Sequence, residues 1–256
     1  MFKRLFNSKK IEFLTLQSTN IITKDIPSKR ISPLTSLKLI GVHVKTEQLR
    51  IICNRLKNLT ELTLIGTHID QRAGQIISNS KLKNLTQLTI GDFIGSESAE
   101  HYLSKEGIMN VLKSGISWKE LTFVSSERYD HMICSSTCKY LSHLQNLAHL
   151  EIGVDNDGFI ELCNFEPNNL KHFCNYASET SEISEYAIQK FCDTFQNLTF
   201  LKLRNTKLGP GCMYHISKLP NLTDLQLERT YVDTESFKHF KYERSKITYS
   251  WLCRLV

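Results

Sequence analysis

The chain has 256 residues, of which 41% are hydrophobic and 23% are charged, and this composition excludes a disordered or collagen-like chain. No stretch approaches the roughly 18 apolar residues that a membrane-spanning helix needs, and the start MFKRLFNSKKIEF lacks the apolar run of a secretory signal. We therefore expect a cytoplasmic protein without a membrane segment. The net charge of +6 is uneven, because residues 1–60 hold 12 Lys or Arg against 3 Asp or Glu. No nucleic-acid-binding module accompanies these charges, so nucleic acid is not an expected partner.

A repeated pattern begins after a basic N-terminal segment, residues 1–10, and occupies residues 11–256. The pattern L-x-x-L-x-L predicts about nine to ten repeats, whose starts lie 23 to 33 residues apart. Clear copies are LTSLKL from Leu34, LTELTL from Leu59, LTQLTI from Leu85, WKELTF from Trp118, LAHLEI from Leu147, LTFLKL from Leu198 and LTDLQL from Leu222. Weaker copies begin at Ile11, Leu170 and Ile247.

Each copy predicts one strand, since its last two apolar residues are two apart and share one face of an extended chain. The segments between copies have helical spacing. From Thr46, for example, Leu49, Ile52, Cys53 and Leu56 form one apolar stripe. Stacked strand-helix units bury these faces in a continuous core, which predicts a parallel sheet with helices on its outer side.

The segment LKNLTELTLIGTHID from Leu56 resembles a leucine-rich repeat, and its helical second half resembles the ribonuclease-inhibitor-like type. This resemblance implies an α/β solenoid, or horseshoe, with a parallel sheet on the concave face and helices on the convex face. Such arrays serve as ligand-sensing ends of NLR receptors in innate immunity and as substrate-recognition ends of F-box adaptors. In this chain no F-box or nucleotide-binding segment precedes the first repeat.

Two features of the array are irregular. The unit from Leu147 contains the turn-rich DNDGFIELCNFEPNNL, so we expect it to lack its outer helix. Apolar residues stand near both ends, Phe2 and Phe6 at the start and Trp251 at the end. Either the chain is a fragment of a larger protein, or a partner covers these ends, or they fold over the terminal repeats as caps.

Sequence motifs for catalysis, cofactors and metals are not found. There is no G-x-S-x-G, P-loop or H-E-x-x-H, so we expect no enzyme activity and no cofactor. His131, Cys134 and Cys138 cannot converge on one zinc ion from a straight helix. Asp155, Asp157 and Gly158 lack the spacing of a calcium loop, so no metal site is predicted. The eight cysteines are spread singly and are expected to be reduced core residues.

The outward strand positions of the second half carry the candidate binding residues. Hot spots of protein interfaces are rich in aromatic residues and arginine. Our first choice is therefore Tyr176, Phe200, Lys202 and Arg204, with a second ring of His149, Glu151, Asp224 and Glu228. We expect these side chains to face solvent. The alternative is that Lys202 and Arg204 only pair across strands with Asp224 and Glu228.

These observations predict a non-enzymatic scaffold that binds a protein partner through the concave face, either alone or as the sensor end of an NLR-like receptor. The alternative function is a substrate-recognition adaptor of an F-box-type ubiquitin ligase.

Overall fold

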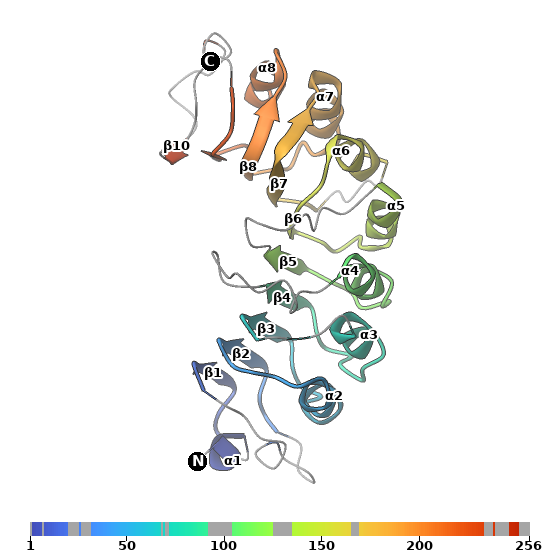
Figure 1. Cartoon of the computed structure of the whole chain (residues 1–256), viewed down its shortest axis with the longest axis vertical. Helices are drawn as coiled ribbons and strands as arrows, with labels where there is room; N and C mark the ends of the chain where they lie inside the picture. The colour runs from blue at the N-terminus through green and yellow to red at the C-terminus, as the bar shows by residue number, and fades with distance from the viewer. Residues whose placement is uncertain are drawn as a thin grey trace. The chain divides into compact units, whose positions relative to one another are not determined.

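The structure is a computed structural model that describes residues 2–6, 8–19, 26, 32–67, 69, 72–91, 104–124, 135–164, 169–232, 238 and 246–250. Its contacts divide the chain into two compact units, Met1–Tyr129 and Asp130–Val256. In each unit, a layer of strands carries a layer of helices on one of its faces, as Figure 1 shows.

The first unit is a parallel sheet whose strands follow one another in chain order. Its elements are α1 (Phe2–Phe6), β1 (Phe13–Gln17), β2 (Ser36–Ile40), α2 (Thr46–Arg55), β3 (Glu61–Ile65), α3 (Ala73–Ser78), β4 (Gln87–Gly91), α4 (Lys105–Leu112) and β5 (Glu120–Val124). Residues 92–103, between β4 and α4, lie outside the described residues.

The second unit repeats this arrangement, again with parallel pairing in chain order from β6 to β10. Its elements are α5 (Ser135–Cys138), the short 3-10 helix η2 (Lys139–His143), β6 (His149–Ile152), α6 (Asn156–Leu162), β7 (His172–Ile183), α7 (Glu185–Thr194), β8 (Phe200–Leu208), α8 (Cys212–Ser217), β9 (Asp224–Glu228) and β10 (Lys246–Ser250). None of the helices described in the two units is long and apolar enough to cross a membrane.

The repeat pattern sets the register of the strands. Leu37, Leu62 and Leu88 occupy the same repeat position, lie side by side on β2, β3 and β4, and are buried. Because β1 to β9 bury the same two positions of the repeat, these positions align between neighbouring strands and form a continuous apolar core within each unit. The predicted strand pattern is thus confirmed.

The outer helices pack as the spacing predicts. In α2 the buried residues include Leu49, Ile52 and Cys53. Neighbouring helices α3 and α4 come so close that a Cβ atom added at Gly74 would overlap the backbone of Gly107. A side chain at this crossing would therefore push the two repeats apart.

The prediction that the unit from Leu147 lacks its outer helix is wrong. Helix α6 forms there because the Asp155 side chain caps it, accepting a hydrogen bond from the Gly158 backbone N–H at 2.7 Å. Phe159 and Leu162 then bury its inner face. The Asp-rich stretch that superficially resembled a calcium loop is a helix start.

The N-terminal apolar residues are partly covered. Phe6 is buried, and its carbonyl oxygen accepts a hydrogen bond from Ser32 Oγ at 3.3 Å. Phe6 is therefore covered by the chain itself. Trp251, the corresponding residue at the other end, lies outside the described residues.

Six of the eight cysteines are described, and all six are buried free thiols: Cys53, Cys138, Cys163, Cys174, Cys192 and Cys212. Burial raises the pKa of both Cys53 and Cys212 to about 12, so these thiols are protonated at neutral pH. The prediction of reduced core cysteines holds for these residues. Cys134, like His131, lies outside the described residues.

Candidate functional site

The candidate residues all lie on one surface of the second unit. Strands β6 to β9 pair in register, so their side chains opposite the helices form three rows, which we call the open face. The first row is His149, His172, Phe200 and Asp224; the second is Glu151, Cys174, Lys202 and Gln226; the third is Tyr176, Arg204 and Glu228. The eight predicted residues are brought together here by the repeat register.

Three rings of the first row are stacked. The ring centroids of His149 and His172 are 3.9 Å apart with an interplanar angle of 10°, and those of His172 and Phe200 are 3.9 Å apart at 6°. Directly paired positions on parallel strands hold the rings at this spacing. The stack holds the two imidazole rings nearly parallel in this structure.

Glu151 joins the first row to the third. Its Oε1 lies 2.7 Å from His149 Nε2 and 3.7 Å from His172 Nε2, and its Oε2 accepts a hydrogen bond from the Tyr176 hydroxyl at 3.1 Å. Burial raises the pKa of the Glu151 carboxyl, but the interactions with His149, His172 and Tyr176 outweigh it and bring the pKa well below its usual range. The carboxylate is therefore charged at neutral pH.

Tyr176 is a neutral hydrogen-bond donor in this network. Burial and the negative charge of Glu151 raise the pKa of its hydroxyl far above the ordinary value. Two cations lie near the ring of Tyr176, since Lys202 Nζ and the Arg204 guanidinium are each 5.9 Å from its centre.

Glu228 holds the two cations. Its Oε2 lies 2.9 Å from Lys202 Nζ and its Oε1 lies 3.0 Å from Arg204 Nε. Cross-strand pairing of Lys202 and Arg204 is therefore present with Glu228. Asp224 instead accepts a hydrogen bond from Gln226 Nε2 at 3.4 Å.

The expectation that these side chains face solvent is wrong for Arg204, which is only 5% exposed. It is covered because Tyr176 and Glu228 flank it on the neighbouring strands. Phe200, Lys202, Tyr176 and Glu228 are half-buried and remain within reach of a partner.

The open face also includes His172 and Cys174, which are not among the predicted binding residues. Cys174 Sγ lies 3.2 Å from His172 Nε2. Burial and the charge of Glu151 raise the pKa of the Cys174 thiol, which is therefore protonated at neutral pH. The signal that could have found His172 is its repeat position, which is the same as that of His149.

Comparisons with known proteins identify the fold. No family model matches the sequence, and no curated protein does. The crystal structure of internalin C2 from Listeria monocytogenes str. 4b F2365 superposes with a TM-score of 0.51 at 17% identity, over 85% of this chain and 81% of that chain. A second internalin (inlF) of the same organism gives a TM-score of 0.47 at 17% identity, over 87% and 68%. Together with the repeat and the parallel sheet, the likeness to internalin C2 shows that the chain has the predicted α/β leucine-rich-repeat solenoid fold.

Proposed function

We propose that the chain is a non-enzymatic scaffold that binds a protein partner through the open face of β6 to β9. The observation that carries this proposal is the cluster of Tyr176, Phe200, Lys202 and Glu228, which joins aromatic surface to paired charges that solvent still reaches. Interface hot spots are enriched in tyrosine, tryptophan and arginine, and Tyr176 is such a residue, held in place by its hydrogen bond to Glu151.

A contrast within the chain supports this location. In the first unit the middle row of the equivalent face is Thr15, Lys38, Thr63, Thr89 and Thr122. Threonine at these positions is what strand propensity alone selects. On β6 to β9 of the second unit the same row is Glu151, Cys174, Lys202 and Gln226, a set that strand propensity does not select.

The type and the setting of the scaffold are further parts of the proposal. Outer α-helices such as α2 and α7 support the ribonuclease-inhibitor-like type. We place the protein in the cytoplasm, where six buried free thiols are the expected state of its described cysteines. The ligand-sensing end of an NLR-like receptor is our preferred setting.

The test is affinity purification of the tagged chain from its native cells, followed by quantitative mass spectrometry. Phe200→Ala combined with Lys202→Ala should reduce recovery of the main partner by roughly tenfold or more. The matched control is Phe13→Ala with Lys38→Ala, which removes the same residue types from the same repeat positions in the first unit. Full recovery with the Phe200 and Lys202 variant, or equal loss with the control, would contradict the proposal.

A further inference from the structure

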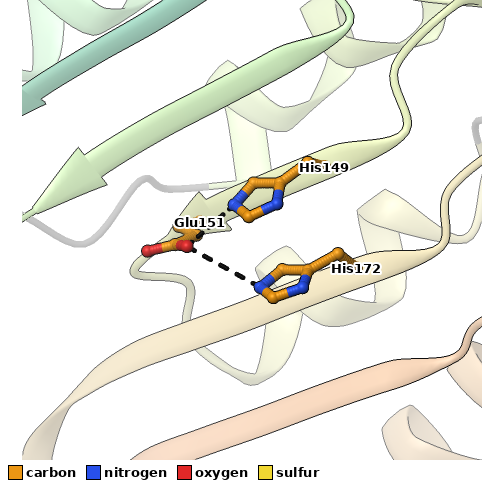
Figure 2. Close-up of side chains that lie close together, drawn as sticks. All are labelled: His149, Glu151 and His172. Atoms are coloured by element: carbon orange, nitrogen blue, oxygen red, sulfur yellow. Dashed lines mark hydrogen bonds and ion pairs between the residues drawn. The ribbon is translucent and has the colours of Figure 1, made fainter. Parts of the chain in front are cut away.

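We infer that His149, Glu151 and His172 form a binding site for one zinc ion at the edge of the open face. Each residue offers one ligand atom, and the three atoms lie within 4.8 Å of one another. Figure 2 shows the two imidazole rings side by side, each with a nitrogen directed at the same Glu151 carboxylate. The inference goes beyond the proposed function, and its test needs no protein partner.

The backbone holds these residues in place. His149 and Glu151 are two apart on β6, so they share one face, and His172 is the direct neighbour of His149 on β7. The buried Asn175 side chain ties the two strands together, since its Oδ1 accepts a hydrogen bond from the Val154 backbone N–H at 2.8 Å. The ligand atoms thus come from paired strands and not from loops.

The distances suit a zinc ion. Bonds of about 2.0–2.2 Å in a tetrahedral site put two ligand atoms roughly 3.3 Å apart. The two distances from Glu151 Oε1, 2.7 Å to His149 Nε2 and 3.7 Å to His172 Nε2, lie on either side of that value. Binding requires the nearly parallel rings to tilt so that their nitrogen lone pairs converge.

The surrounding groups favour such a site. Tyr176 donates its hydrogen bond to Glu151 Oε2, which leaves Oε1 for the metal, and Phe200 stacks against the His172 ring. Neighbours of this kind orient metal ligands and strengthen binding. The three side chains are 26%, 18% and 26% exposed, so an ion can enter from solvent and a water can take the fourth position.

A simple His–Glu ion pair does not account for this arrangement. Such a pair exists on the helical side, where His215 Nε2 lies 3.2 Å from Glu185 Oε1. At Glu151, by contrast, two imidazoles converge on one carboxylate oxygen. Two imidazoles and one carboxylate are a ligand set that zinc accepts. Among the residues that the structure describes, this is the one such cluster of three.

The experiment is isothermal titration of the reduced, tag-free chain with Zn²⁺, repeated with the variants His149→Phe, His172→Phe and Glu151→Gln. Phenylalanine keeps the ring stack and glutamine keeps the side-chain size, so circular dichroism should be unchanged. We expect one zinc per wild-type chain. Removal of a residue that only hydrogen-bonds to a metal ligand lowers metal affinity roughly tenfold to hundredfold. Each variant removes a ligand itself, so its zinc affinity should fall by more than this.

The control His215→Ala should bind zinc as the wild type does. Co²⁺ absorption provides a second readout, because a tetrahedral ion gives intense visible bands that the variants should lack. Either of two results would overturn the inference. One is zinc affinity that is unchanged in both His149→Phe and His172→Phe, and the other is a wild-type chain that does not bind one zinc ion per chain. The zinc titration does not depend on the proposed function, because it would give the same result if no protein partner binds the open face.

Discussion

Arg204 is a charged residue of the open face that is almost fully buried. Its guanidinium is almost fully covered and lies 3.0 Å from Glu228. Arg204→Ala leaves Glu228 with one cation and opens a gap beside Tyr176. We expect a loss of about 1–3 kcal/mol in the free energy of unfolding, measured by urea denaturation.

The matched control is Lys207→Ala on the same strand. Lys207 pairs with Glu182 at 3.0 Å, but both side chains are more than half exposed, 59% and 56%. Exposed pairs contribute about 0–1 kcal/mol. Equal effects of the two substitutions would show that Arg204 is not buried in solution.

The buried thiols predict how stability responds to alkaline pH. Unfolding lowers the pKa of Cys53 and Cys212 from about 12 in the folded chain to about 9. A raised folded-state pKa stabilises the folded chain below about pH 9, and this contribution is lost as the pH rises toward 12. The wild type should therefore lose about 1 kcal/mol per thiol between about pH 8 and about pH 10.

The measurement is urea denaturation at both pH values for the wild type and for Cys53→Ala with Cys212→Ala. The variant is less stable overall, but its stability should fall less over this pH interval. An identical fall would mean that the two thiols ionise equally in the folded and unfolded states.

At the scale of the elements, a charge should destabilise the chain far more on the buried face of a strand than on its outward face. Leu88 is buried in the core, whereas its neighbour Thr89 lies on the outward face between Thr63 and Thr122. Leu88→Asp should cost more than about 4 kcal/mol, because it buries an unpaired charge. Thr89→Asp should cost about 1 kcal/mol or less. Thermal melting that ranks them in the opposite order would show that the strand register is wrong.

The strands were predictable from the sequence, and helix α6 was not. A strand needs only the L-x-x-L-x-L spacing, which repeats along the chain. The stretch after Asp155 reads as a turn, because Asp, Asn and Gly favour turns. Only the contact of the Asp155 carboxylate with the Gly158 N–H shows that the same residues begin a helix.

The candidate surface was predictable as a set of positions but not as a network. Repeat register places His149 and His172 on one face, yet residues 23 positions apart give no sign that their rings stack. The burial of Arg204 depends on its neighbours Tyr176 and Glu228, which belong to other repeats. Contacts between side chains of different repeats depend on the folded structure and cannot be predicted from the repeat pattern.

At the scale of the whole molecule, one repeat architecture carries two different surfaces. The first unit presents mainly threonine in the middle row of its open side, and the second presents stacked rings, a shared carboxylate and two cations held by Glu228. The same backbone register positions both sets. Our proposal that the second unit binds the partner therefore rests on its side chains and not on its fold.

Site-specific photo-crosslinking tests this assignment most directly. A benzophenone amino acid replaces Phe200 on the open face or, in a matched variant, the exposed Tyr214 on the helical side. We predict that the main partner crosslinks to position 200 and not to position 214. Crosslinking at position 214 without crosslinking at position 200 would contradict the assignment of the open face as the binding surface.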